Sequence, residues 1–295
     1  MTETVRSDEF GFPIQQTPVQ KSRRSRILDE EVDKEKPAFR VLNLDDLEKL
    51  PEPEWLVEGF MPASSLTTLY GAPGSAKSFL ALDAALCVAT GTKFHGAPVK
   101  SGRVVYSLGE GIRGLRWRIE AWCIAHPTAD RDAIMENFVV IPRAVHLLEE
   151  YDVSLLFNTI ERQRSVDLLI IDTLARALVG GDENSAGDVG RAIAACDQVR
   201  DMTGSATLLV HHTDAAGTKA RGSTALPGAS DCMIRMGKDA TQNVISIQCT
   251  KMKDSEPFKP VYFDLKPYGH SAALVSRALA DTRFKAADRR EESPF

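Results

Sequence analysis

Short apolar runs alternate with longer amphipathic segments through the middle of the chain, from about residue 39 to residue 265. The runs predict β-strands and the amphipathic segments predict helices, an order typical of a mainly parallel sheet joined by crossover helices. The predicted strands are Leu66–Tyr70, Arg103–Leu108, Asp167–Ile171 and Ala206–Val210. The predicted helices are Lys77–Thr90, Gly114–Ala125, Val153–Arg164 and Gly187–Met202. We therefore expect one α/β domain over residues 39–265, with Gly91 as the C-cap of its first helix.

The pattern changes after about residue 231, where the apolar runs are broken by polar turns. Three antiparallel strands are expected on the edge of the same sheet, at Asp231–Met236, Asn243–Gln248 and Val261–Leu265. Residues 266–295 are expected to form a polar C-terminal tail, in which Ala272–Ala287 could be a short amphipathic helix before a disordered end. Residues 1–38 are polar and contain the basic cluster Lys21–Arg26, which predicts a disordered N-terminal arm.

Composition narrows the class of protein. The chain has 295 residues, of which 43% are hydrophobic and 26% charged, as in ordinary globular domains. No apolar run approaches the roughly 20 residues of a transmembrane helix, so we expect a cytoplasmic protein without a membrane role. The five cysteines have no metal-type spacing and are expected to be reduced thiols. The net charge of −5 argues against a surface that binds nucleic acid throughout, although a local basic groove is compatible with it.

The segment GAPGSAKS, Gly71–Ser78, departs from the phosphate-loop pattern G-x-x-x-x-G-K-[ST] only at Ala76. Its place between a strand and a helix allows backbone N–H groups and the helix dipole to hold phosphates, with Lys77 at the β- and γ-phosphates and Ser78 at Mg²⁺. The predicted nucleotide-contacting residues are Gly71, Ala72, Pro73, Gly74, Ser75, Ala76, Lys77, Ser78 and Phe79. Alanine is harmless at position 76 if φ is negative there, and costly if φ is positive. The plain alternative is a Gly-Pro turn that only connects strand to helix.

Two carboxylates follow predicted strands, at the sheet edge where ligands bind in open α/β folds. Asp172 ends a strand of four consecutive apolar residues and could hold Mg²⁺ through water, or could simply cap a turn. Glu110 stands between Gly109 and Gly111 and is the candidate to orient or deprotonate an attacking water. Its alternative role is a helix-entry glutamate favoured by the helix dipole.

The strand Ala206–Val210 ends in two histidines, His211 and His212, which must point to opposite faces. One of them could sense the γ-phosphate, and a buried structural histidine is the alternative. Lys219 and Arg221 follow in a loop of small residues. They are either a plain surface pair or residues that reach the γ-phosphate of a neighbouring subunit, in which case activity depends on oligomerisation.

These motifs form an ordered set that resembles the RepA branch of the RecA-like ATPases, the hexameric helicases of plasmids and phages. The resemblance covers about residues 38–265 and rests on the segments GAPGSAKSFLALD, SLGEGIRGLRWRIEAW, LLIIDTLARA, LLVHHT and KARGSTALPGASD. It implies a RecA-like P-loop core with helices on both faces of the sheet, ATP and Mg²⁺ as cofactors, and a ring with single-stranded DNA at its centre. The chain departs from the family at Ala76, a variant also carried by the similar loop of MoxR-type ATPases, and at Pro227.

The resemblance also implies roles for individual residues. Glu110 would be the catalytic carboxylate, Asp172 the Mg²⁺-associated acid and His212 the sensor, while Lys219 and Arg221 would act on the adjacent subunit. The expected function is an ATP-driven DNA helicase in plasmid or phage replication. The alternatives are a recombination or strand-annealing ATPase without unwinding, and a nucleotide-dependent switch.

Contacts with DNA are expected in the loop Val179–Gly187, although its Asp182 and Glu183 would oppose a polyanion. The basic cluster Lys21–Arg26 is a weaker candidate, better explained as part of a disordered tail. The end Glu291–Phe295 resembles the partner-docking tail of bacterial single-strand-binding proteins, and chance is its better explanation.

Overall fold

The computed structural model describes residues 41–49, 54–163, 165–239, 241 and 243–277. The predictions for the arm 1–38, with Lys21–Arg26, and for the end Glu291–Phe295 lie outside these residues. The chain divides into two units, Met1–Pro51 and Glu52–Phe295. The described part of the first unit contains α2 (Leu44–Glu48), which begins at a capping box. In that box, the Asp46 N–H donates to Oδ1 of Asn43 at 2.9 Å and the Asn43 N–H donates to Oδ2 of Asp46 at 3.1 Å.

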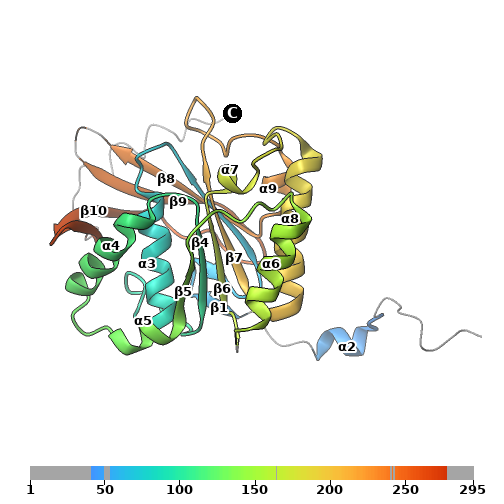
Figure 1. Cartoon of the computed structure of the whole chain (residues 1–295), viewed down its shortest axis with the longest axis horizontal. Helices are drawn as coiled ribbons and strands as arrows, with labels where there is room; N and C mark the ends of the chain where they lie inside the picture. Colours follow the sequence, from blue (N-terminus) through green and yellow to red (C-terminus); the bar gives the residue numbers. More distant parts are fainter. Residues whose placement is uncertain (1–40, 50–53, 164, 240, 242, 278–295) are drawn as a thin grey trace, which may run out of the picture. The chain divides into compact units, whose positions relative to one another are not determined.

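The second unit is built on a sheet of nine strands within the described residues, in the order β11-β10-β9-β8-β3-β7-β6-β4-β5 (Figure 1). The strands are β3 (Leu66–Gly71), β4 (Val104–Leu108), β5 (Phe138–Ile141), β6 (Leu168–Asp172), β7 (Ala206–His212), β8 (Cys232–Asp239), β9 (Val244–Met252), β10 (Val261–Tyr268) and β11 (Ser271–Ser276). From β8 to β5 in this order, neighbouring strands are parallel. Beyond β8, each of β9, β10 and β11 is antiparallel to the strand before it. A separate hairpin joins β1 (Trp55–Val57) to β2 (Met61–Pro62).

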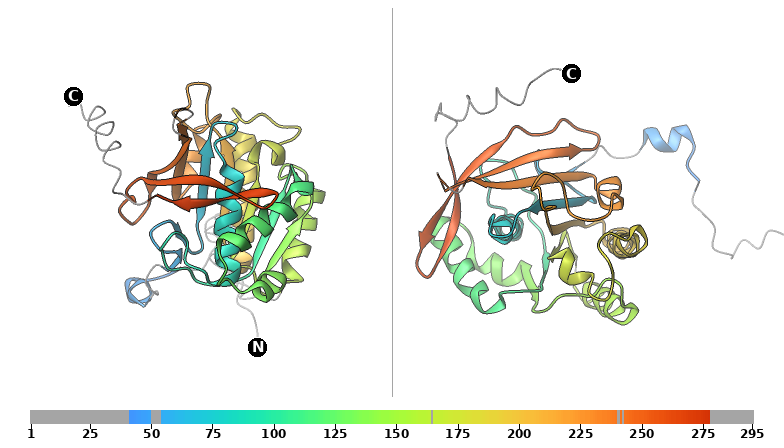
Figure 2. Two further views of the ribbon diagram at one scale, coloured as in Figure 1. Left: turned by 90° about the vertical axis from the view of Figure 1, so that its left-hand side faces the viewer. Right: turned by 90° about the horizontal axis from the view of Figure 1, so that it is seen from above.

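Helices cover both faces of this sheet, as Figure 2 shows. They are α3 (Lys77–Thr90), α4 (Ile112–Ala125), α5 (Arg131–Asn137), α6 (Glu150–Glu161), α7 (Leu174–Ala177), α8 (Ala186–Thr203) and α9 (Ala225–Ala229). Alternation along the central strands feeds two cores. In β4, Val104 and Tyr106 pack with α3, α4 and α5, whereas Val105 packs with α6 and α8. Burial on both faces explains why these strands are apolar throughout. No helix of the described residues is long and apolar enough to cross a membrane.

The predicted α/β class is confirmed, and so are the central elements. Helix α3 begins at Lys77 and ends at Thr90, where Gly91 takes φ 71° as its cap. It is buried on nearly all sides because the hairpin of β10 and β11 bends over it and over α4 (Figure 2). The short edge strand β5 and the helix α5 before it were not predicted. Pro227, at which the chain departs from the RepA-type pattern, lies in the first turn of α9, where a backbone N–H has no helical acceptor, so proline is tolerated there.

Two predictions for the C-terminal part are wrong. The strand at Asp231–Met236 was expected to be antiparallel, but β8 is parallel to β3, with Thr67 opposite Cys232. The chain between β7 and β8 contains α9 and is long enough for a crossover, so β8 can return in the same direction. The helix expected over Ala272–Ala287 is instead strand β11 up to Ser276, and residues 278–287 lie outside the described part. Gly269 takes φ 54° in the turn that pairs β11 with β10, which extends the sheet beyond residue 265.

Candidate active site

A pocket of about 380 Å³ opens at the carboxyl ends of the parallel strands. Its walls come from the loop between β3 and α3, from the residues that follow β4, from the end of β6 and from the end of β7. Lys77, Glu110, Asp172 and His212 all line it. Four residues chosen from separate motifs therefore meet at one place, because the carboxyl ends of parallel strands share an edge.

The loop between β3 and α3 contains a close backbone approach at Gly71 and two residues with positive φ. A Cβ on Gly71 would lie 2.5 Å from the carbonyl oxygen of Met236, so glycine is required for β3 to approach β8 here. Gly74 takes φ 76°. Ala76 also lies in the left-handed region, with φ 70°. Of the two alternatives for position 76, the structure has the costly one: the alanine methyl group imposes strain of about 1 kcal/mol where glycine would have none.

Lys77 is buried, and its Nζ donates to the loop carbonyl oxygens of Gly71 at 2.8 Å and Ala72 at 2.9 Å. Burial lowers the pKa of this amine, and the nearby Asp172 carboxylate partly opposes that shift. The side chain is thus a desolvated cation held against its own loop. An anion in the loop would gain a strong charge interaction there because little water screens it.

Asp172 is the last residue of β6 and is also buried. Its Oδ2 accepts a hydrogen bond from the Tyr106 hydroxyl at 2.8 Å. Burial raises the pKa of this carboxyl group, while hydrogen bonds from Ser78 and Tyr106 oppose the shift. The Ser78 hydroxyl and the Asp172 carboxylate therefore lie next to each other, as oxygen ligands for Mg²⁺ should. Tyr106 was missed in the sequence because an aromatic residue within a strand usually indicates only packing.

Glu110 follows β4 at the mouth of the pocket. Its position depends on Gly109, whose N–H donates to the Asp172 carbonyl oxygen at 2.7 Å and where a Cβ would lie 3.0 Å from the Cβ of Arg176. Arg176, from α7, donates through Nε to Oε1 of Glu110. Both side chains are exposed. The candidate catalytic carboxylate thus has a cationic partner that the sequence did not predict.

Comparison with known proteins places the chain in a family. Residues 31–218 match the family model AAA_25, described as an AAA domain. The chain belongs to the AAA domain family. No curated protein matches it.

Two solved structures are similar to this AAA domain. A KaiC-like protein from the hyperthermophilic archaeon Pyrococcus horikoshii OT3 has a TM-score of 0.55 and 14% identity, and the match covers 75% of this chain and 93% of that one. The RadB recombinase has a TM-score of 0.50 and 13% identity, with 69% of this chain and 88% of that chain covered. At such identities the likeness shows the fold, which is RecA-like. The comparisons thus give an AAA domain with a RecA-like fold, and the RepA branch remains a prediction.

The two histidines of the AAA domain have different surroundings. His211 is buried, its Nε2 lies 2.8 Å from the carbonyl oxygen of Arg221, and burial lowers its pKa. His212 is the one that lines the pocket. Burial lowers the pKa of His212 too, and the Lys77 charge adds to that shift, so the ring is neutral near pH 7. Its Nδ1 is buried and has no hydrogen-bond partner among the described residues.

Arg221 and Lys219 do not reach this pocket. Arg221 lines a separate hollow of about 420 Å³ beside Ala72 and Pro73, and its guanidinium pairs with Glu183 from the loop after α7. Lys219 is exposed in the same segment. The pairing changes the expectation for the loop Val179–Gly187, since the Glu183 charge is neutralised by Arg221 within the chain.

Arg118 is a pocket residue that the motifs did not single out. It extends from α4, and its Cζ lies 5.1 Å from the centre of the Phe79 ring. Phe79, in the first turn of α3, also lines the pocket. The sequence could have indicated this position. Arg118 lies on the same face of α4 as Gly111 and Leu115, and α4 starts beside Glu110.

Proposed function

We propose that the chain is the subunit of a hexameric ring that hydrolyses ATP with Mg²⁺ and uses the energy to move along and unwind DNA. The observation that carries the proposal is the convergence of Lys77, Glu110, Asp172 and His212 on one pocket at the carboxyl edge of a RecA-like sheet. A site that had lost its function would not be expected to keep all four.

The residues of the pocket fit ATP and Mg²⁺. Loop N–H groups and the start of α3 would hold the phosphates, and Lys77 would exchange its two carbonyl acceptors for phosphate oxygens. Ser78 and Asp172 would hold Mg²⁺, which would supply positive charge beside the phosphates. Arg118 and Phe79 would offer flat surfaces for the base.

Two further residues complete the proposed chemistry. Glu110 would orient the attacking water and take its proton. His212, which lines the pocket, would make a hydrogen bond to the terminal phosphate and so distinguish ATP from ADP.

The ring is proposed because Arg221 lies outside the pocket yet on the same edge of the sheet. Its exposed guanidinium, and the Lys219 amine beside it, could complete the site of an adjacent subunit. An arginine supplied in this way is worth roughly 10³ to 10⁵ in rate. Mass measurement in solution, with and without ATP and single-stranded DNA, tests the assembly.

A forked-duplex unwinding assay, run beside ATPase measurements, tests the function. Unwinding that requires ATP and is lost in Glu110→Gln is the expected result. DNA-stimulated ATPase without unwinding would replace the helicase with a recombination or strand-annealing ATPase. ATPase activity that DNA does not change would favour a nucleotide-dependent switch.

A further inference from the structure

The segment of residues 174–185, here called the connector, comprises α7 and the loop that leads to α8. It carries two charged side chains that pair with candidate catalytic residues on either side. Arg176 donates to Glu110, and Glu183 accepts from Arg221. One short segment thus holds both the carboxylate proposed to activate water and the arginine proposed to act on a neighbour.

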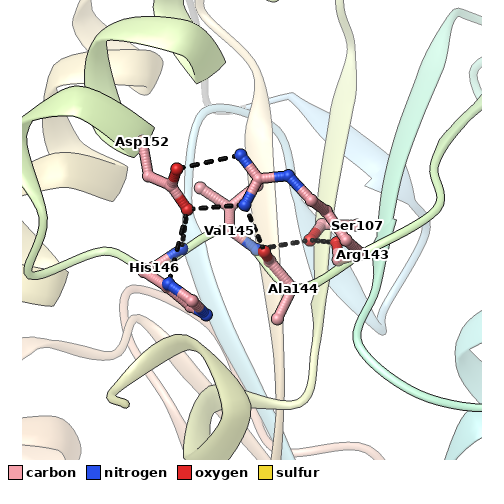
Figure 3. A network of polar contacts seen from close by, with 6 residues as sticks. All are labelled: Ser107, Arg143, Ala144, Val145, His146 and Asp152. Atoms are coloured by element: carbon pink, nitrogen blue, oxygen red, sulfur yellow. Dashed lines mark hydrogen bonds and ion pairs between the residues drawn. The ribbon is translucent and has the colours of Figure 1, made fainter. Parts of the chain in front are cut away.

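The loop of residues 143–147, part of which is drawn in Figure 3, is hydrogen-bonded to the connector. Arg143 makes two hydrogen bonds to the Asp152 carboxylate, at 2.7 and 2.9 Å, and the His146 N–H donates to the same carboxylate at 2.9 Å. These contacts hold Arg143 and the residues after it in place. From this loop the Leu147 N–H donates to the carbonyl oxygen of Ala177 in the connector at 2.9 Å.

The far end of the connector is tied to the segment that contains Arg221. The Ser223 N–H donates to the Glu183 carbonyl oxygen at 2.8 Å. A Cβ on Gly222 would lie 2.3 Å from that oxygen, so only glycine permits the approach. Displacement of the connector would therefore be transmitted to Arg221 as well as to Glu110.

The contact between Arg176 and Glu110 has the properties of a reversible restraint. The Nε–H of Arg176 occupies a carboxylate oxygen of Glu110 that would otherwise be available to a water molecule. Both side chains are more than half exposed, at 55% and 62%, so the pair is weak and easily exchanged.

We propose that the connector restrains the ATPase in the absence of nucleic acid, and that the phosphate backbone of single-stranded DNA releases Glu110 by competing for Arg176. The inference rests on the proposed function. A guanidinium matches the geometry of a phosphate as well as that of a carboxylate, so a DNA phosphate is a direct competitor for this side chain. Arg176 is exposed. Of the two acidic residues that would repel DNA, Glu183 is paired with Arg221, whereas Asp182 remains an exposed negative charge.

The test compares Arg176→Ala with the wild type in steady-state ATPase assays, with and without oligothymidylate. The variant should hydrolyse ATP about two- to fivefold faster without DNA, the range expected for loss of one exposed ion pair. The ratio of DNA-stimulated to DNA-free rates should fall by the same factor. Arg176→Lys, which keeps the charge, should stay close to the wild type.

Lys100→Ala is the matched control. Lys100 pairs with Glu54 at 2.6 Å, and their side chains are 54% and 61% exposed, nearly the values of the connector pair. Lys100 precedes β4, at the opposite end of that strand from Glu110. This control should leave both rates unchanged, and thermal unfolding should show that all three variants are folded.

The outcomes separate the inference from the function on which it rests. A wild type that oligothymidylate does not stimulate overturns the proposed action on DNA, and release by DNA with it. A stimulated wild type, together with an Arg176→Ala variant that is slower without DNA or has an unchanged stimulation ratio, overturns the restraint alone.

Discussion

The charged groups around the pocket fall into a buried half and an exposed half. Lys77 and Asp172 are only 6% and 4% exposed, and Tyr106, which supports Asp172, is 1% exposed. The side chains of Glu110 and Arg221 are 62% and 56% exposed, and each is paired with a connector residue. The half proposed to hold the nucleotide is therefore set by the folded core. The half proposed to control turnover depends on surface ion pairs that a ligand or a neighbouring subunit can exchange.

The largest effect is expected for Lys77→Ala, in the buried half. Loss of its charge should abolish ATP turnover, because both the binding of the phosphates and the stabilisation of their charge depend on this contact in a desolvated site. Burial disfavours the charged amine in the folded protein, so its removal should cost little stability. Turnover is measured by phosphate release and folding by thermal unfolding. Turnover at the wild-type rate would overturn the site assignment.

Arg221→Ala tests the exposed half. It should leave ATP binding nearly intact, because Arg221 lies outside the pocket, and should reduce hydrolysis by about a thousandfold if the residue completes a neighbour's site. Mixing this variant with Glu110→Gln subunits should restore part of the hydrolysis, at interfaces where an intact Glu110 meets an intact Arg221. A mixture as inactive as its components would argue against action between subunits.

Tyr106→Phe, in the buried half, should lower the free energy of unfolding. It leaves the buried Asp172 carboxylate without one hydrogen bond, which costs about 1 to 3 kcal/mol. The free energy of unfolding in denaturant measures the loss. Arg176→Ala is the control from the exposed half and should change that free energy far less. If the two variants lost equal free energy of unfolding, the buried and exposed halves would not differ in their contribution to stability.

The distinction between the halves also marks what the sequence could predict. Strand ends and the phosphate loop are local patterns, so the positions of Lys77, Glu110, Asp172 and His212 at one edge followed from the order of elements. Partners that are distant in sequence carry no local pattern. The Arg176 contact with Glu110 spans 66 residues, and its two ends became neighbours only through the pairing of β4 with β6.

The errors in the fold have the same origin. The direction of β8 depends on the crossover through α9, and the fate of residues 271–276 depends on β10 as a pairing partner. Apolar periodicity cannot show either of these. The left-handed conformation of Ala76 is likewise imposed by the loop as a whole, although alanine disfavours it.

Acidification should lower the free energy of unfolding through the buried His211. Burial lowers the pKa of this histidine in the folded chain, so the unfolded chain binds more protons and stability falls as the pH drops below about 6.5, the ordinary pKa of the residue. Asp172 has the opposite effect on stability. Because its pKa is raised in the folded chain, its contribution to stability increases as the pH falls toward about 4, the ordinary pKa of a carboxyl group. Unfolding measured across this range should be less dependent on pH in His211→Gln. An equally steep dependence in the variant would exclude His211 as the source.

The smallest effect is expected for Ala76→Gly. Glycine removes the left-handed strain of about 1 kcal/mol but also increases the entropy of the unfolded chain at a cost of about 0.4 to 1 kcal/mol, so the net gain should be at most a few tenths of a kcal/mol. Gly74→Ala is the converse control, since Gly74 takes φ 76° and nothing lies within 4 Å of an added Cβ. It should lose stability through strain alone. If Ala76→Gly gains stability and keeps the wild-type turnover rate, the alanine is only a strained substitute for glycine. If turnover changes as well, the strain alters how the loop holds phosphate, and the backbone at position 76 belongs to the catalytic machinery of the buried half.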